Sequence, residues 1–486
     1  MIIPVERLAS ALAAAGLLVE ARGELPLWVE SVSDDSRGIR RGDGFVAVRG
    51  SERDGHDFLA KAAAAGAAFA VVDDARLTSI PTLVVRDTRR AAAVVAAAAS
   101  DWPARRLRLI GVTGTNGKST TVHMLRHLLD EPGARSASIG TIGVFVGSAG
   151  DELPDTSGLT TPGPIQLQRL LRRLVDAGVR TVAMEVSSHA LDQRRVDGLA
   201  FDAVVFTNLT RDHLDYHGSM TAYRRAKARL AEQLSPRGTL VVNSDDAAWR
   251  GLRAAKRITF GARGRPDVRA AGVAFSATGS TMAVMVGSAS HDVRLPLIGD
   301  FNVVNALGAA AAALALRVPA DTVMARLATV PQVPGRLELV YERPMVLRDY
   351  AHTPDALQRA LAAVRPFTRG RLIVVFGAGG DRDRGKRPRM GAIAERLADI
   401  VIVTSDNPRT EDPERILDDI EAGMKRRNRE RIEDRRAAIA RALAIAGPDD
   451  VILLAGKGHE TYQVRGTEHL PFDERRVVAE LAQGRR

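Results

Sequence analysis

The sequence predicts an α/β protein with three domains, and three observations lead to that prediction. Short apolar segments alternate with longer amphipathic ones along most of the chain, which is typical of parallel sheets covered by helices on both faces. Breaks in this alternation place the domains at residues 1–101, 102–335 and 336–486. The length of 486 residues suits three domains of ordinary size.

The first domain is expected to be a small α/β unit. Strands are predicted at 43–48, 69–72 and 83–85, and helices at 56–65 and 88–100. Its end is placed just before Trp102-Pro103, because proline commonly follows a helix terminus. The polar stretch Ser33–Arg37 could hold a sugar or phosphate through its hydroxyls and arginine, but the same composition also forms ordinary turns.

The second domain is expected to be a sheet with covering helices. Its strands are predicted at 107–112, 181–186, 203–207 and 239–242, and its helices at 120–129, 164–176 and 220–233. Residues 268–297 are more typical of β-hairpins, and an Ala-rich helix is expected at 302–316.

The third domain repeats the alternation and is predicted to be a Rossmann-like unit. Its strands are predicted at 345–348, 372–376, 400–404 and 451–454, and its helices at 355–363, 390–398, 413–424, 435–446 and 474–482. Open α/β sheets bind ligands just past the carboxyl ends of their strands. We therefore look for functional residues directly after these strands.

A glycine-rich loop between the first strand and helix of the second domain predicts a phosphate site. It contains Gly114, Thr115, Asn116, Gly117, Lys118, Ser119 and Thr120. Glycines let backbone N–H groups approach an anion, and the helix N-terminus adds partial positive charge. Lys118 can reach the outer phosphates of a nucleotide, and the Ser119 hydroxyl can bind Mg²⁺. One position departs from the general P-loop pattern, because Val112 stands where a glycine is expected.

Composition excludes several classes of protein. The chain has no cysteine, so disulfides, thiolate nucleophiles and Cys-ligated metals are ruled out. The longest apolar run, 309–316, is too short to span a bilayer, and the N-terminus lacks the features of a signal peptide. We therefore expect a cytoplasmic protein without membrane insertion. The net charge of +11 could indicate nucleic acid, but the basic run at 425–431 is predicted to be a solvated helix face.

Two strand ends of the second domain carry groups suited to metal chemistry. Glu185 ends one strand and is a plausible Mg²⁺ ligand beside a phosphate loop. His213 lies in the His- and Asp-rich segment that follows the next strand. Only seven of the 69 Lys and Arg residues are lysines, and Lys227 is one of them, with arginines around it. Nearby cations lower a lysine pKa, and a neutral amine can add CO₂ to form a carbamate; a surface lysine is the alternative.

Five motifs occur in one order along the chain: Thr115–Ser119, Glu185–His189, Asp212–Gly218, Pro334–Glu338 and Asp349–Asp355. With these motifs the sequence resembles the Mur ligases over nearly its whole length. The resemblance implies three domains and ATP-dependent amide-bond formation in peptidoglycan precursor synthesis, and hence a role in cell wall biogenesis, cell shape and cell division.

The resemblance also implies roles for residues around ATP and Mg²⁺. Gly114 to Thr120 would hold the phosphates, Asn305 the adenine, and Arg336 the γ-phosphate, while Asp349 would meet the nucleotide from the last domain. Ser119, Glu185 and His213 would serve Mg²⁺, and Lys227 would be carbamylated by CO₂. We expect Lys118, Lys227, His213 and Arg336 to be the catalytic residues.

The resemblance implies UDP-N-acetylmuramoyl-L-Ala-D-Glu as the acceptor and an amino acid as the third substrate. The acceptor would meet Ser36, Ser51, Glu52 and Arg53, and also Thr160, Thr161, Ser187, Gln193 and Arg195. In the last domain, Arg382, Arg409 and Glu460 combine two cations with an anion, which suits an amino acid with a distal carboxylate and amine. Within the family, Asp406-Asn407-Pro408-Arg409 resembles the form specific for meso-diaminopimelate, and this pocket would also include Gly456.

Three alternatives remain open at this point. Folylpolyglutamate synthase shares the phosphate-loop motif and the chemistry, but the extra first domain argues against it. An L-lysine-adding Mur ligase would differ only in its amino acid. A P-loop NTPase acting on nucleic acid is favoured by charge alone, and the sequence contains no recognisable nucleic-acid module. We expect no nucleic-acid partner and a monomer.

Overall fold

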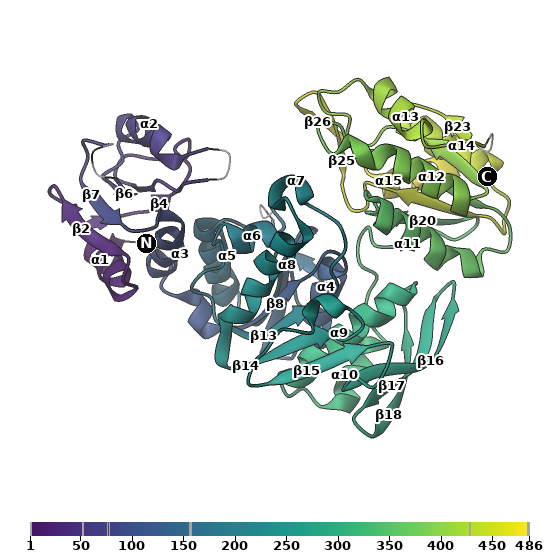
Figure 1. The fold of residues 1–486 in the computed structure, drawn as a ribbon, viewed down its shortest axis with the longest axis horizontal. Helices are drawn as coiled ribbons and strands as arrows, with labels where there is room; N and C mark the ends of the chain where they lie inside the picture. The colour runs from purple at the N-terminus through teal and green to yellow at the C-terminus, as the bar shows by residue number, and fades with distance from the viewer. Residues whose placement is uncertain are drawn as a thin grey trace. The chain divides into compact units, whose positions relative to one another are not determined.

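The computed structural model of the chain describes residues 2–50, 53–74, 76, 78–154, 158–426 and 429–483. The chain forms two compact units, and Figure 1 shows the helices and strands along it. The first comprises Met1–Phe260 and Gly308–Val318, and the second comprises Gly261–Leu307 and Pro319–Arg486. Both units are built from sheets and helices, as the sequence predicts.

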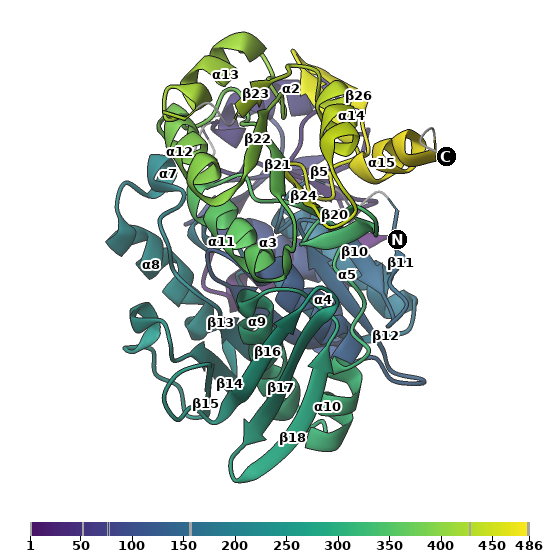
Figure 2. The same ribbon diagram turned by 90° about the vertical axis from the view of Figure 1, so that its right-hand side faces the viewer.

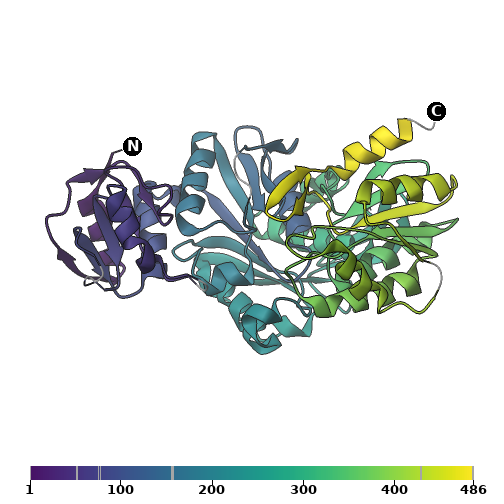
Figure 3. The same ribbon diagram turned by 90° about the horizontal axis from the view of Figure 1, so that it is seen from above.

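The N-terminal part of the first unit, purple in Figure 3, is a small α/β fold. Its sheet has the order β2-β7-β6-β5-β4, in which only β2 is antiparallel to its neighbour. The strands are β2 (Leu18–Arg22), β4 (Val32–Ser33), β5 (Gly44–Val46), β6 (Phe69–Val72) and β7 (Thr82–Val85). Its helices are α1 (Val5–Ala14), α2 (Leu59–Ala64) and α3 (Thr88–Ala99), and β1 (Ile3–Pro4) pairs with β3 (Trp28–Val29).

The rest of the first unit is a mainly parallel sheet that carries the phosphate loop. Neighbouring strands run in the order β9 (Arg135–Gly140), β12 (Val179–Glu185), β8 (Arg108–Thr113), β13 (Phe201–Phe206), β14 (Leu234–Asn243) and β15 (Arg257–Gly261). Two antiparallel strands, β10 (Gly143–Val146) and β11 (Asp151–Glu152), extend the β9 edge. The helices are α4 (Lys118–Leu128), α5 (Pro164–Asp176), α6 (Ser188–Asp192), α7 (Leu214–His217) and α8 (Met220–Ala228).

Burial explains why these segments form a sheet. Leu109, Ile110 and Val112 of β8 are fully buried, as expected for a central parallel strand covered on both faces. The carboxyl ends of β12, β8 and β13 meet at one edge, where the predicted phosphate and metal residues follow.

The second unit contains three antiparallel strands and a Rossmann-like sheet. The hairpins at 268–297 are confirmed as β16 (Val268–Ser276), β17 (Gly279–Val286) and β18 (Ala289–Leu295). The Rossmann-like sheet has the order β19 (Glu338–Tyr341), β20 (Met345–Asp349), β24 (Val451–Ala455), β21 (Leu372–Phe376), β22 (Ile400–Val403) and β23 (Arg429–Arg431). Only β19 is antiparallel to its neighbour. The unit also contains α10 (Ala320–Leu327) and a two-stranded sheet formed by β25 (Tyr462–Arg465) and β26 (Glu468–Pro471).

Helices cover both faces of the Rossmann-like sheet (Figure 2). One face packs against α11 (Pro354–Val364), α12 (Arg387–Leu397) and α13 (Pro413–Glu421), and the other against α14 (Arg435–Ile445) and α15 (Glu474–Gln483). Helix α9 (Asp300–Ala315) contributes residues to both compact units. In the part of the chain that the structure describes, no helix is long and apolar enough to cross a membrane.

The prediction of a helix face for the basic run at 425–431 is wrong. Helix α13 ends at Glu421, and Arg429–Arg431 forms strand β23. Arg431 pairs with Glu414, Asp418 and Glu421, with 2.7 Å between Arg431 Nη1 and Asp418 Oδ1. Acidic side chains that lie earlier in the sequence therefore neutralise this arginine and hold it at the sheet edge. Arg427 and Asn428 of the same run lie outside the described residues.

Candidate functional site

The glycine-rich loop leaves β8 and enters α4 in the conformation expected for a phosphate cradle. Gly117 directly precedes the helix with a φ of 84°, in the left-handed region. Gly114 has a φ of 151°, and a Cβ at this position would collide with Thr207 Oγ1. Only glycine fits here without strain. At Gly114 the loop therefore packs directly against Thr207, the residue that follows β13.

Residues after β13 fix the shape of this loop. Asn208 accepts hydrogen bonds from Thr115 N at its carbonyl oxygen (2.8 Å) and from Asn116 N at Oδ1 (2.9 Å). Thr207 Oγ1 donates to the Asn116 carbonyl at 2.7 Å. The N-terminal half of the loop is thus held by protein groups, and the N-terminus of α4, beginning at Lys118, lies at its other end.

Two lysine amines converge on a single carbonyl of the loop. Lys118 Nζ donates to the Gly114 carbonyl at 3.0 Å and to the Thr115 carbonyl at 2.8 Å. Lys227 Nζ, from α8, donates to the same Gly114 carbonyl at 2.8 Å. Lys227 is 1% exposed. The predicted position of Lys227 in the phosphate region therefore agrees with the geometry, and the alternative of a surface lysine is wrong.

The surroundings of Lys227 favour its neutral form. Burial lowers its pKa well below the usual lysine value, and the positive charge of Lys118 lowers it further. Asp212 opposes this effect. The Tyr223 ring centroid lies 4.6 Å from Lys227 Nζ. An unprotonated amine is the nucleophile that a carbamate requires, so these surroundings suit the predicted reaction with CO₂.

Histidine and tyrosine rings gather beside the two lysines. His189 lies 4.7 Å from His213 and 4.2 Å from Tyr216, measured between ring centroids. His213 has a φ of 52°, which turns the chain into α7. Partial burial lowers the pKa of His213, although Asp212 acts in the opposite direction. At neutral pH the His213 ring is therefore mostly neutral.

Glu185 is held at the end of β12 with an exposure of 1%. Its Oε1 accepts from Thr141 N at 2.9 Å, and its Oε2 accepts from Thr141 Oγ1 at 3.2 Å. Thr141 Oγ1 also lies 2.9 Å from Thr160 Oγ1. Thr160, predicted to contact the acceptor, is therefore linked to Glu185 through one threonine.

The donor set fits a magnesium ion that is bound mainly through nucleotide phosphates. Among the described residues, no group of three or more His, Asp or Glu side chains could hold a metal by itself. Mg²⁺ in nucleotide sites usually takes one or two protein oxygens and completes its shell with phosphates and water. Ser119 and Glu185 carry oxygens of this kind. The His213 nitrogen is a less usual ligand for this ion.

The residues predicted to hold the muramyl peptide form one connected group. Thr161 Oγ1 donates to the Glu185 carbonyl at 2.9 Å and accepts from Ser187 N at 3.1 Å. Arg195 Nη1 donates to the Thr161 carbonyl at 3.0 Å, and Arg195 Nη2 donates to Gln193 Oε1 at 2.6 Å. The structure thus brings together residues separated by more than 30 positions in the sequence.

Two further residues belong to this region and were not singled out from the sequence. Tyr216 OH donates to Asp192 Oδ2 at 2.9 Å and lies 3.3 Å from Gln193 Nε2. Burial raises the pKa of Asp34, while Arg169 and Arg195 act to lower it. Asp34 was noted only as part of a polar turn. Arg195, whose charge acts on Asp34, lies more than 150 positions away in the sequence, so local pattern could not identify this interaction.

A cavity of about 510 Å³ lies next to this group in the first unit. It is lined by Arg89, Asp192, Asp215, Tyr216, His217, Ala222, Arg225, Ala226 and Arg229. Its lining is mostly charged or polar, which suits a polar ligand. The cavity extends from the histidine and tyrosine cluster to α3, which belongs to the N-terminal part of the unit.

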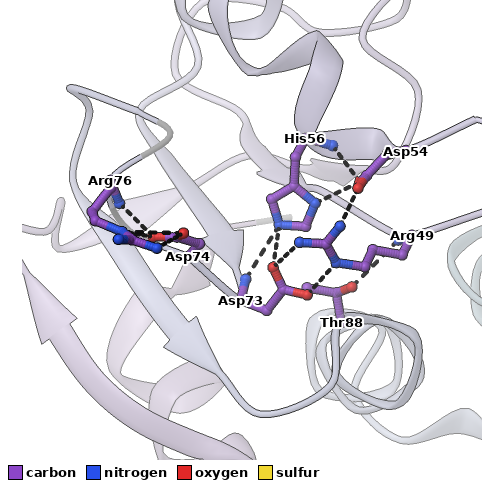
Figure 4. Close-up of polar contacts among 7 residues, drawn as sticks. All are labelled: Arg49, Asp54, His56, Asp73, Asp74, Arg76 and Thr88. Carbon is purple, nitrogen blue, oxygen red and sulfur yellow. Dashed lines mark hydrogen bonds and ion pairs between the residues drawn. The ribbon is translucent and has the colours of Figure 1, made fainter.

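The predicted UDP-contacting segment has a rigid frame, shown in Figure 4. His56 Nδ1 lies 2.7 Å from Asp54 Oδ1, and His56 Nε2 accepts from Asp73 N at 3.2 Å. Arg49 binds Asp73 with 2.8 Å between Nη2 and Oδ1, and it also pairs with Asp54. This frame flanks Arg53, whose carbonyl accepts from Gly50 N at 2.9 Å.

Of the other residues predicted to contact UDP, the structure describes one and not the other two. Ser36 is buried in the turn after β4. Ser51 and Glu52 lie outside the described residues.

Three residues predicted to serve the nucleotide lie in the second unit. Asp349 ends β20 and accepts from Leu337 N at 2.8 Å. Burial raises the pKa of Asp349 to about 6, with the charge of Arg336 opposing the rise. The Arg336 guanidinium carbon lies 4.9 Å from the Tyr350 ring centroid. Asn305 lies on α9 and donates from Nδ2 to Asn302 at 3.2 Å.

The residues predicted to choose the amino acid gather at one edge of the Rossmann-like sheet. Asn407 Nδ2, after β22, donates to Glu460 Oε2, after β24, at 2.8 Å. A Cβ on Gly456 would collide with Asp406 Oδ2, so these two residues also touch. The backbone passes on through Pro408 to Arg409.

The two arginines of this group approach the same glycine. Arg409 has a φ of 52° and donates from Nη1 to the Gly380 carbonyl at 2.8 Å. A Cβ on Gly379 would lie 2.9 Å from Arg409 Nη1 and 3.9 Å from Arg382 Cγ. Arg382 is exposed and donates to the Asp381 carbonyl at 3.0 Å. Both arginine side chains therefore pass close to Gly379.

Known families and sequences match the chain along most of its length. The family description "Mur ligase family, catalytic domain" matches residues 29–108, "Mur ligase middle domain" matches 112–313, and "Mur ligase, glutamate ligase domain" matches 335–458. A UDP-N-acetylmuramoyl-L-alanyl-D-glutamate–2,6-diaminopimelate ligase of Synechococcus elongatus is 45% identical and covers 93% of both chains. The ligase of the same name from Gloeobacter violaceus is 43% identical and covers 100% of this chain and 99% of its own.

Solved structures agree with these matches. A structure of a UDP-N-acetylmuramoyl-L-alanyl-D-glutamate–2,6-diaminopimelate ligase has a TM-score of 0.68 and 32% identity, and covers 96% of this chain and 97% of its own. Mycobacterium tuberculosis folylpolyglutamate synthase complexed with ADP has a TM-score of 0.63 and 20% identity, and covers 76% of this chain and 91% of its own; it shares the fold. The resemblance read from five motifs is thereby confirmed: the chain belongs to the Mur ligase family, whose members are amide-bond-forming ligases.

Proposed function

We propose that this chain is the ATP-dependent ligase that adds meso-diaminopimelate to UDP-N-acetylmuramoyl-L-alanyl-D-glutamate in peptidoglycan precursor synthesis. The observation that carries the proposal is the 45% identity, over 93% of both chains, to a protein named for this reaction. The geometry supports it in both units: a phosphate loop contacted by two lysine amines in the first, and a group of polar and oppositely charged side chains at one edge of the Rossmann-like sheet in the second.

The proposed reaction activates a carboxylate and then transfers it to an amine. An oxygen of the D-glutamyl γ-carboxylate attacks the γ-phosphorus of ATP, ADP leaves, and an acyl phosphate forms. A diaminopimelate amine then attacks the acyl carbon, inorganic phosphate leaves, and the amine loses a proton as the amide forms. In such transfers a protein acts mainly by positioning the reactants and by stabilising charge.

Named residues support these tasks. We assign Lys118 and the N-terminus of α4 to the phosphates, and Arg336 to the γ-phosphate. Mg²⁺, bound through Ser119 and Glu185 with His213 close by, would supply further positive charge. Lys227 would carry a carbamate, formed as its neutral amine adds CO₂ and releases a proton. This converts a buried amine into an anion, which arginine at the same position could not become.

The substrate-binding residues are proposed on the same basis. Ser36, Ser51, Glu52 and Arg53 would bind the uridine nucleotide, and Thr160, Thr161, Ser187, Gln193 and Arg195 the muramyl peptide. Arg382, Asp406 to Arg409, Gly456 and Glu460 would bind the amino acid. In this proposal the enzyme acts in the cytoplasm as a monomer, on small molecules and not on nucleic acid.

Phosphate release from ATP tests the proposed function. The chain is supplied with UDP-N-acetylmuramoyl-L-Ala-D-Glu and with meso-diaminopimelate, L-lysine or no amino acid, and the product is weighed by mass spectrometry. We expect phosphate release when meso-diaminopimelate is the amino acid supplied, no release with L-lysine or without an amino acid, and a product with the mass of the matching tripeptide. Release with L-lysine alone would overturn the assignment of Arg409, and release stimulated only by DNA or RNA would overturn the proposed function.

A further inference from the structure

Lys457 is a buried lysine next to the amino-acid pocket that has no assigned role. Its exposure is 0%, and it lies between Gly456 and Gly458, which have φ values of 119° and 54°. A Cβ on Gly458 would lie 2.7 Å from Tyr350 Cβ. Glycine is favoured on both sides of Lys457, and the lysine side chain between them is buried in the protein.

The Lys457 amine binds the two side chains that link the pocket loops. Nζ donates to Asn407 Oδ1 at 3.1 Å and to Glu460 Oε2 at 3.1 Å. It lies 4.0 Å from Asp406 Oδ1. Strands β22 and β24 flank β21, so the loops that carry these groups leave the same edge of the sheet. Lys457 thus joins two loops that are about 50 residues apart in the sequence.

These bonds fix the orientation of both partners. Asn407 Oδ1 accepts from Lys457 and from Val464 N (2.9 Å), so the amide nitrogen faces Glu460 Oε2 and donates to it. Glu460 Oε2 therefore accepts two hydrogen bonds. Among the residues that the structure describes, Glu460 Oε1 accepts none, and it can receive a ligand's ammonium group.

Charge gives a second reason for a lysine at this position. Asp406 and Glu460 are two carboxylates in one largely buried pocket, and like charges in such a place repel each other. The ammonium of Lys457 compensates one of them. The pocket then has the net charge to accept one ammonium, while Arg409 remains for a carboxylate. A burial this complete would be costly for a lysine without such partners.

We propose that Lys457 is a positioning residue for the amino-acid substrate: it holds Glu460 and Asn407 in the orientation that receives the substrate's ammonium group and sets the pocket's charge. This inference rests on the proposed function of the pocket and extends it to a residue that would not touch the substrate. Replacing Lys457 should therefore weaken binding of the amino acid and leave binding of the other two substrates unchanged.

The test compares Lys457→Met with a matched control, Lys425→Met, which removes an exposed lysine of the same unit. KM and kcat are measured for meso-diaminopimelate, ATP and the nucleotide sugar in turn. Loss of charge-assisted hydrogen bonds should raise KM for meso-diaminopimelate roughly 10- to 100-fold. KM for ATP and for the nucleotide sugar should stay within about twofold in both variants, and the control should leave all three values unchanged.

Lys457→Gln serves as the second variant, because it keeps a donor for Asn407 and Glu460 but lacks the charge. A smaller rise in KM than in Lys457→Met is expected, and this variant decides the question if Lys457→Met does not fold. Equal rises for all three substrates, or an unchanged KM for meso-diaminopimelate in a folded variant, would overturn the inference. A wild-type chain that ignores meso-diaminopimelate would instead overturn the proposed function.

Discussion

The buried carboxyl group of Asp349 should make the second unit less stable as the pH rises. Its pKa is raised to about 6 by burial, against 3.8 for an ordinary aspartate. Between these two pH values the folded chain still holds a proton that the unfolded chain has released. Stability therefore falls as the pH rises through this window, and the loss is complete above the folded pKa. A neutral side chain at position 349 should abolish this contribution.

The size of the effect follows from the two pKa values. A shift of about two pKa units corresponds to about 3 kcal/mol in the free energy of unfolding. Asp349→Asn should therefore be more stable than the wild type by up to about 3 kcal/mol at pH 7.5. At pH 4 the wild-type group is protonated when folded and about half protonated when unfolded, so the difference should shrink below about 1 kcal/mol.

Urea unfolding followed by circular dichroism measures this difference at both pH values. Hydrogen exchange of the amides in β20 assigns the transition to the second unit, because all three tryptophans, Trp28, Trp102 and Trp249, lie in the first. A difference between wild type and Asp349→Asn that is the same at pH 4 and pH 7.5 would refute the reasoning. A wild type that is more stable at pH 7.5 than the variant would refute it as well.

Three further predictions concern other buried charges. Lys227→Arg should lower ligase turnover by at least about 100-fold, because arginine forms no carbamate. Removal of CO₂ should lower phosphate release by the wild type, and added bicarbonate should restore it, whereas neither treatment should affect the variant. Arg435 and Glu474 form an ion pair in which both side chains are 0% exposed. Replacing either residue by Met should lower the free energy of unfolding by about 3–5 kcal/mol, and replacing both should lower it by less, as measured by urea unfolding. A loss in the double variant that equals the sum of the two single losses would contradict this. His56→Ala should destabilise the N-terminal fold by about 2 kcal/mol, because the Asp54 carboxylate and the Asp73 backbone N–H each lose a hydrogen-bond partner. The exposed Arg76→Ala control should stay within about 0.5 kcal/mol, and tryptophan fluorescence measures both.

Local pattern was enough to predict the phosphate loop and most of the regular elements. The prediction for Gly114 and Gly117 depends on neighbouring residues only, and both glycines adopt positive φ values. Parallel strands such as β21 were predicted because buried strands are continuous apolar runs. Strands β1 and β3 have two residues each and carry no such pattern, so they were not predicted.

Contacts between distant segments were not predictable from one sequence. Lys457 is hydrogen-bonded to Asn407, which lies 50 residues away in the sequence. Asp34 and Arg195 are more than 150 positions apart in the sequence, and neither carries a local signal for the other. The basic run around Arg431 was misjudged for the same reason, because its acidic partners lie on α13. In each case a tertiary contact determines the role of a side chain whose local pattern is ambiguous.

One isotope experiment tests most directly whether this chain activates a carboxylate and joins it to an amine. UDP-N-acetylmuramoyl-L-Ala-D-Glu is labelled with ¹⁸O in both oxygens of its γ-carboxylate and incubated with ATP, Mg²⁺ and meso-diaminopimelate. The account predicts that one ¹⁸O appears in inorganic phosphate and the other remains in the amide of the tripeptide product. The account would be contradicted if the released phosphate carried no ¹⁸O, or if the nucleotide sugar were not joined to diaminopimelate by an amide bond.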